Sequence, residues 1–70
     1  MAKTAQVINT RDLRAAIDRS TYGTSGRYVY GVTADGREVR ITAIRVRPGI
    51  VYGYELQTGY YTPIVSWMER

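Results

Sequence analysis

Five arginines, spread over about twenty residues of this 70-residue chain, have the side chains best suited to binding chemistry. Arg40, Arg45 and Arg47 share one segment rich in valine, isoleucine and threonine, with Arg37 just before it and Arg27 further upstream. A guanidinium group keeps its charge and presents forked donors that fit phosphate oxygens. Such a row can neutralise several phosphates along nucleic acid. The structural alternative is a solvated face, or an edge strand charged against aggregation.

The overall charge agrees with an anionic partner. The chain has ten basic and six acidic residues, a net charge of +4, and all but one of its cations are arginine. This balance fits nucleic acid or an acidic protein as the partner. An ordinary solubility charge of this size is the alternative.

Tyrosine is the second abundant residue type with binding potential, at seven copies. We expect Tyr22 and Tyr60 to be the most exposed rings, and we add them to the candidate partner-binding residues. The pairing described below turns the other rings toward the core. If one helix leaves part of that face uncovered, it would suit a protein interface or a homodimer. The tyrosines expected to face inward are Tyr28, Tyr30, Tyr52, Tyr54 and Tyr61.

Catalytic chemistry has little support in the composition. The chain has no histidine and no cysteine, so it lacks the usual general base, the thiolate nucleophile and the commonest metal ligands. Glu38 and Glu55 are expected to be single outward carboxylates on different hairpins, so no paired acid and base is expected. We predict a protein that is not an enzyme and holds neither a metal nor a cofactor.

A glycine-rich segment at 23–27 offers a weaker binding motif. Its successive amides could form a phosphate-binding nest. It lacks the Gly-Lys-Ser/Thr ending of a nucleotide-binding loop, and no strand precedes it. An ordinary loop is the expected structure.

The elements that must position these residues form one domain over 1–70. Residues 1–8 are a lead or an edge strand, 9–19 a helix, 20–26 a loop and 27–67 a β-meander. Asn9 or Thr10 can cap the helix, whose apolar stripe is narrow and must dock on the sheet. The expected class is mainly β (α+β), with four or five antiparallel strands in a small barrel or a strongly bent sheet.

Turn residues divide the meander into four strands. The predicted strands are 27–34, 38–47, 51–57 and 60–67, separated by Asp35-Gly36, Pro48-Gly49 and Thr58-Gly59. Two-residue turns at the first and last of these place Val32 opposite Val39, Tyr30 opposite Ile41, Leu56 opposite Tyr61, Tyr54 opposite Pro63 and Tyr52 opposite Val65. Each set then forms an apolar face directed at the core.

The second strand changes phase midway. Val39, Ile41, Ile44 and Val46 all face the core only if a bulge or a sharp bend lies near residues 42–43. The arginines of this strand then point to solvent. A three-residue loop at 48–50 agrees best with this pattern, and a two-residue Pro-Gly turn is the alternative.

This order of a short helix, a loop and a meander with a kinked second strand, over residues 9–67, resembles the small-barrel group of SH3-like and Sm-like folds. The resemblance lies in element order, and it implies RNA binding or ring formation.

The sequence therefore predicts a nucleic-acid-binding β domain that contacts phosphates through its second-strand arginines. The alternative is a protein-binding module, such as a small inhibitor or assembly factor of the kind phages and plasmids encode. A homo-oligomer is possible. No apolar run is long enough to span a membrane, and the N-terminus lacks a secretory core, so we expect a cytoplasmic protein.

Overall fold

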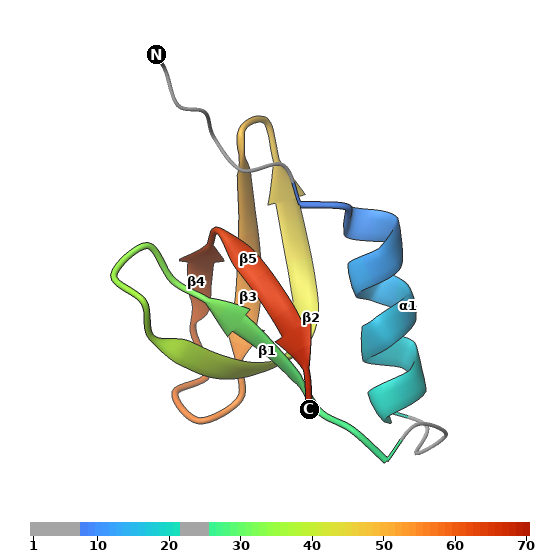
Figure 1. Cartoon of the computed structure of the whole chain (residues 1–70). Coiled ribbons are helices and arrows are strands. Elements are labelled where there is room, and N and C mark those ends of the chain that lie inside the picture. Colours follow the sequence, from blue (N-terminus) through green and yellow to red (C-terminus); the bar gives the residue numbers. More distant parts are fainter. Residues whose placement is uncertain (1–7, 22–25) are drawn as a thin grey trace.

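The computed structural model describes residues 8–21 and 26–70 (Figure 1). Helix α1 (Thr10–Thr21) precedes five strands in one antiparallel sheet of order β4-β3-β2-β1-β5. The strands are β1 (Val29–Val32), β2 (Glu38–Arg47), β3 (Ile50–Glu55), β4 (Tyr61–Ile64) and β5 (Ser66–Glu69). The predicted class, a short helix followed by a strongly bent antiparallel sheet, is confirmed. The sheet is not closed into a barrel, because the edge strands β4 and β5 are not paired with each other.

Helix α1 begins with a side-chain cap. The Asp12 amide donates to Asn9 Oδ1 at 3.1 Å, and the Leu13 amide donates to the Asn9 carbonyl at 3.0 Å. Leu13, Ala16 and Ile17 are buried against the sheet, as their spacing predicts. Figure 1 shows α1 running beside β2. The helix therefore covers the inner face of the bent sheet, and we call the opposite side the outer face.

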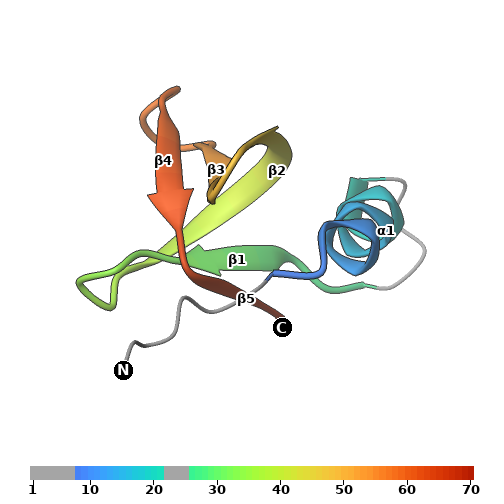
Figure 2. The ribbon, with the colours of Figure 1, turned by 90° about the horizontal axis from the view of Figure 1, so that it is seen from above.

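Strand β2 carries the predicted bend. Its pairing with β3 shifts by one residue between Ile41 and Ile44, so one extra residue of β2 lies at 42–43. In Figure 2, β2 curves from beside β1 to beside β3, and β4 stands at a steep angle to β1 and β5. The bulge thus lets one strand serve both halves of the sheet.

The β1–β2 hairpin differs from the prediction by one residue. Gly31 pairs with Val39, and the Thr33 amide donates to the Arg37 carbonyl at 2.9 Å, so the loop has three residues. Gly36 adopts a φ of 88° there, the left-handed conformation that ends such a loop. The predicted pairs of Val32 with Val39 and of Tyr30 with Ile41 are therefore wrong. The inner side of β1 carries Val29 and Gly31, and the buried Thr33 follows directly after the strand.

The remaining two hairpins also correct the prediction. Arg47 pairs with Ile50 across a two-residue Pro-Gly turn, which is the alternative that the sequence pattern disfavoured. Tyr54 pairs with Tyr61, and the Glu55 amide donates to the Tyr60 carbonyl at 2.8 Å, so the loop has four residues, 56–59, where a two-residue turn at 58–59 was expected. The predicted partners of Tyr52 and Tyr54 are wrong by two residues, and Leu56 lies in the loop, although Tyr52, Tyr54, Tyr61 and Pro63 do share a face.

The shared tyrosine face is the outer one, which overturns the expectation of a tyrosine core. The buried hydrophobic side chains are Leu13, Ala16, Ile17, Val29, Val39, Ile41 and Ile64, with Trp67 packed partly against them. In both Val29-Tyr30-Gly31 and Val51-Tyr52-Gly53, the valine and glycine lie on the inner side and the tyrosine on the outer side. Glycine takes the inner position because isoleucine side chains occupy the space beside its backbone.

The predicted fourth strand is split in two. Pairing with β3 ends at Ile64. The Val65 amide then donates to the Val32 carbonyl at 2.8 Å, and the chain continues as β5 along β1. The fifth strand of the described sheet is therefore 66–69. Of the predicted lead or edge strand at 1–8, residues 1–7 lie outside the described residues, and Ile8 packs partly against the core outside any strand.

Candidate nucleic-acid interface

The outer face of β2, β3 and β4 brings two of the predicted arginines beside two tyrosines. Arg45 pairs with Tyr52 across the β2–β3 ladder, and Tyr52 pairs with Pro63 on β4. Arg45, Arg47, Tyr52 and Tyr61 line a shallow depression of about 230 Å³, which we call the outer hollow. Three neighbouring strands thus build one surface of charge and rings.

The side chains of the outer hollow contact one another. The Arg45 guanidinium carbon lies 4.6 Å from the centre of the Tyr61 ring, a cation–π arrangement. Tyr54 meets Tyr61 edge-on, with ring centres 5.2 Å apart and planes at 65°. Arg47 donates from Nη1 to the Val46 carbonyl at 3.1 Å. These contacts hold the rings and Arg45 in place before any ligand arrives.

No acidic side chain lines the outer hollow, and all six acids of the chain are among the described residues. Two are on α1, one is in the β1–β2 turn, one is on β5 and one opens β2. The sixth, Glu55, is 7% exposed on the inner side of β3 and accepts a hydrogen bond from Thr62 Oγ1 at 3.1 Å. The expectation that Glu55 points outward is therefore wrong. The positive charge of Arg45 and Arg47 is not offset locally.

Arg40 belongs to the other half of β2, before the bulge. It is exposed, and its guanidinium carbon lies 3.7 Å from the centre of the Tyr28 ring. Nearby, Arg70 stacks over Tyr30 at 4.8 Å and forms an ion pair with Glu38. Within the described chain, none of the three β2 arginines is ion-paired to a carboxylate.

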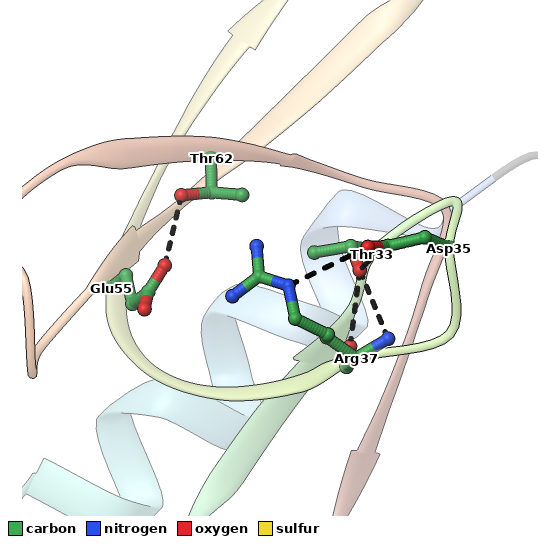
Figure 3. Close-up of polar contacts among 5 residues, drawn as sticks. All are labelled: Thr33, Asp35, Arg37, Glu55 and Thr62. Atoms are coloured by element: carbon green, nitrogen blue, oxygen red, sulfur yellow. Dashed lines mark hydrogen bonds and ion pairs between the residues drawn. The ribbon is translucent and has the colours of Figure 1, made fainter.

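Arg37 is held in the β1–β2 turn, apart from the outer hollow. Its Nε lies 3.7 Å from Asp35 Oδ2, and its amide donates to Thr33 Oγ1 at 3.0 Å (Figure 3). The Thr33 hydroxyl donates to the Asp35 carboxylate, and this bond, with the nearby Arg37 charge, holds the pKa of Asp35 below its ordinary value of 3.8. Arg37 therefore serves the turn.

The remaining candidates lie away from the outer hollow. Arg27 is exposed in the segment that leads into β1. Tyr60 is 73% exposed, as predicted, but it is not among the residues that line the hollow. Tyr22 and most of the glycine-rich segment lie outside the described residues. The residues missed by the sequence argument are Tyr52, Tyr54 and Tyr61, whose grouping was correct and whose direction was not.

Residues 8–21 and 26–70 show no metal-binding arrangement. No group of three or more His, Cys, Asp or Glu side chains is close enough to hold an ion. Over the same residues, no helix has the length and apolar character to cross a membrane.

Comparison with known proteins adds no relative. No protein-family model matches the chain, and neither a curated protein nor a solved structure gives a significant match.

Proposed function

We propose that this chain is a nucleic-acid-binding β domain without enzymatic activity, and that its outer face contacts phosphates through Arg45 and Arg47. The observation that carries the proposal is the grouping of these two cations with Tyr52 and Tyr61 in a hollow that no carboxylate lines. A phosphate backbone needs unpaired cations, and bases need flat apolar surfaces. Arg40 extends the same side of β2 and adds a further phosphate contact.

The strand order supports this proposal from the level of the fold. The order β4-β3-β2-β1-β5, with a bent β2 shared by both halves, fits an open variant of the SH3-like and Sm-like small barrels. We infer membership of that group from topology, and the nucleic-acid function from the residues of the outer face.

The test is a salt titration of oligonucleotide binding with charge-matched variants. The double variant Arg45→Gln/Arg47→Gln should weaken binding of a labelled mixed-sequence oligonucleotide, as measured by fluorescence anisotropy. Its plot of log affinity against log salt should be shallower by about 1.4 for single strands or about 1.8 for duplex, since each lost phosphate contact removes about 0.7 or 0.9.

The matched control is Arg11→Gln/Arg14→Gln, which removes the same charge from the exposed side of α1. It should keep most of the affinity and the native salt slope. Equal losses in the two double variants would mean that only net charge matters, and they would contradict the proposed site. Circular dichroism confirms that each variant is folded.

A protein-binding module is the second candidate. Leu56, Tyr60 and Val65 are 47%, 73% and 40% exposed, which leaves apolar surface at and after the β3–β4 loop. This candidate predicts no oligonucleotide binding at low salt. It also predicts that an acidic protein partner is lost when Tyr60 or the arginines are replaced.

A further inference from the structure

The outer hollow combines two features that select among nucleic acids. Its rings are accessible from solvent, with Tyr61 39% exposed and Tyr52 half-buried. Its volume of about 230 Å³ lies below the range of about 300–1,000 Å³ typical of pockets that enclose small ligands. A flat group that rests against the rings and leaves its other side in solvent suits such a depression.

We infer that the outer hollow receives an unpaired base, so that the domain prefers single-stranded nucleic acid over duplex; this inference rests on the proposed function. The base would contact the Tyr52 ring and the stacked Arg45–Tyr61 pair, since both aromatic rings and guanidinium planes stack on bases. In a duplex the bases stack on one another, and their flat faces are not available to a protein surface.

The spacing of the two cations agrees with a single strand. Arg45 and Arg47 are two positions apart on one strand, so their backbones are separated by about 7 Å. A flexible single strand can turn a base toward the hollow while its neighbouring phosphates lie beside the two arginines.

The arrangement also explains the sequence tolerance that we expect. The hollow is lined by two arginines, which only donate hydrogen bonds, and by two phenol rings, with no acidic side chain and no amide side chain of Asn or Gln. Every base has a flat face that can stack, whereas specific readout needs matched donors and acceptors at the base edge. Affinity should therefore vary little among single strands of different sequence.

The decisive experiment compares a labelled ten-nucleotide DNA strand with the same strand annealed to its complement, using the full chain at fixed low salt. We expect the single strand to bind about tenfold or more tightly than the duplex. Replacing Tyr52 or Tyr61 by leucine should weaken single-strand binding by about tenfold, the effect of losing one stacked base. Tyr52→Phe and Tyr61→Phe keep the rings and should keep the affinity.

Tyr60→Leu is the matched control, because it removes an exposed ring that does not line the hollow. It should leave single-strand affinity unchanged. Equal or tighter binding of duplex, with leucine variants that behave like the native chain, would overturn the single-strand inference while the proposed function stands. Absence of binding to either oligonucleotide at low salt would overturn both.

Discussion

Two glycines on the inner face decide which way the neighbouring tyrosines point. A Cβ atom on Gly31 would lie 2.7 Å from Ile64 Cγ2, and one on Gly53 would lie 2.7 Å from Ile41 Cγ2. Real side chains do not approach that closely, so these positions accept only glycine without movement of the core. The absent side chains make room for the isoleucines, and the alternation of each strand then turns Tyr30 and Tyr52 outward.

Gly31→Ala should therefore destabilise the fold through overpacking. We expect the free energy of unfolding to fall by about 1–3 kcal/mol, measured by urea denaturation. Ile64→Leu moves the branch away from Cβ and removes the nearest methyl group, so the double variant should recover part of the loss. A Gly31→Ala variant as stable as the native chain would show that Ile64 adjusts without cost.

At the scale of elements, the Asp35 carboxylate in the β1–β2 turn makes the stability of the fold depend on pH. Asp35 has a lower pKa in the folded chain than its ordinary 3.8, first because Thr33 donates a hydrogen bond to it. The ionised carboxylate therefore stabilises the fold above that value, and this contribution is lost as the pH falls through the lower pKa of the folded state.

Asp35→Asn should remove this share of the acid sensitivity. The variant should be less stable than the native chain at neutral pH, and the difference should shrink below pH 3.8 as the native carboxylate becomes protonated. Urea midpoints measured across this range provide the test. Thr33→Ser keeps the hydroxyl donor and should follow the native profile. A constant difference at every pH would exclude the carboxylate as the cause.

Elements were easier to predict than their register. The helix cap, the apolar stripe of α1 and the bulge at 42–43 follow from local residue types, and the structure confirms them. Loop length does not follow in the same way, because Asp35-Gly36 fits both a two-residue turn and the end of a three-residue loop. One residue of difference reverses the faces of β1.

The apolar pattern of the sequence did not predict the direction of the tyrosine face, for a related reason. Counting apolar residues favours Tyr52, Tyr54 and Tyr61 as core, because each ring is large and the opposite positions hold Gly53, Glu55 and Thr62. The buried Glu55 is tolerated because Thr62 donates a hydrogen bond to it. The sequence pattern does not reveal that Ile41 of the neighbouring strand fills the space over Gly53. Arg40, Arg45 and Arg47 were nevertheless predicted correctly as exposed.

At the scale of the whole molecule, the open sheet leaves β4 with a free edge. The Glu55 amide bonds to the Tyr60 carbonyl at 2.8 Å, so alternation along this ladder directs the backbone nitrogen of Pro63 away from β3. Proline has no N–H, and the edge therefore lacks a donor at that position. This edge is protected against strand-to-strand association.

Pro63→Thr should restore the donor and promote self-association through β4. We expect a higher weight-average sedimentation coefficient than that of the native chain at the same concentration. Pro48→Ala, which changes a proline in the β2–β3 turn, is the control and should sediment like the native chain. Unchanged sedimentation of Pro63→Thr would mean that other features of the edge prevent pairing. A native oligomer that dissociates on this substitution would show that the edge already serves as an interface.

The extra residue in β2 has a consequence for how this surface can change over time. The pairing shift is a single residue, so loss of one codon at 42 or 43 would remove the bulge and leave Ile44 opposite Gly53. Arg45 and Arg47 would stay on the outer face, but β2 would lose the bend through which it serves both halves of the sheet. Point substitutions can tune the ligand preference of this face gradually, whereas a deletion at the bulge would straighten β2 and change the angle between the two halves of the sheet in one step.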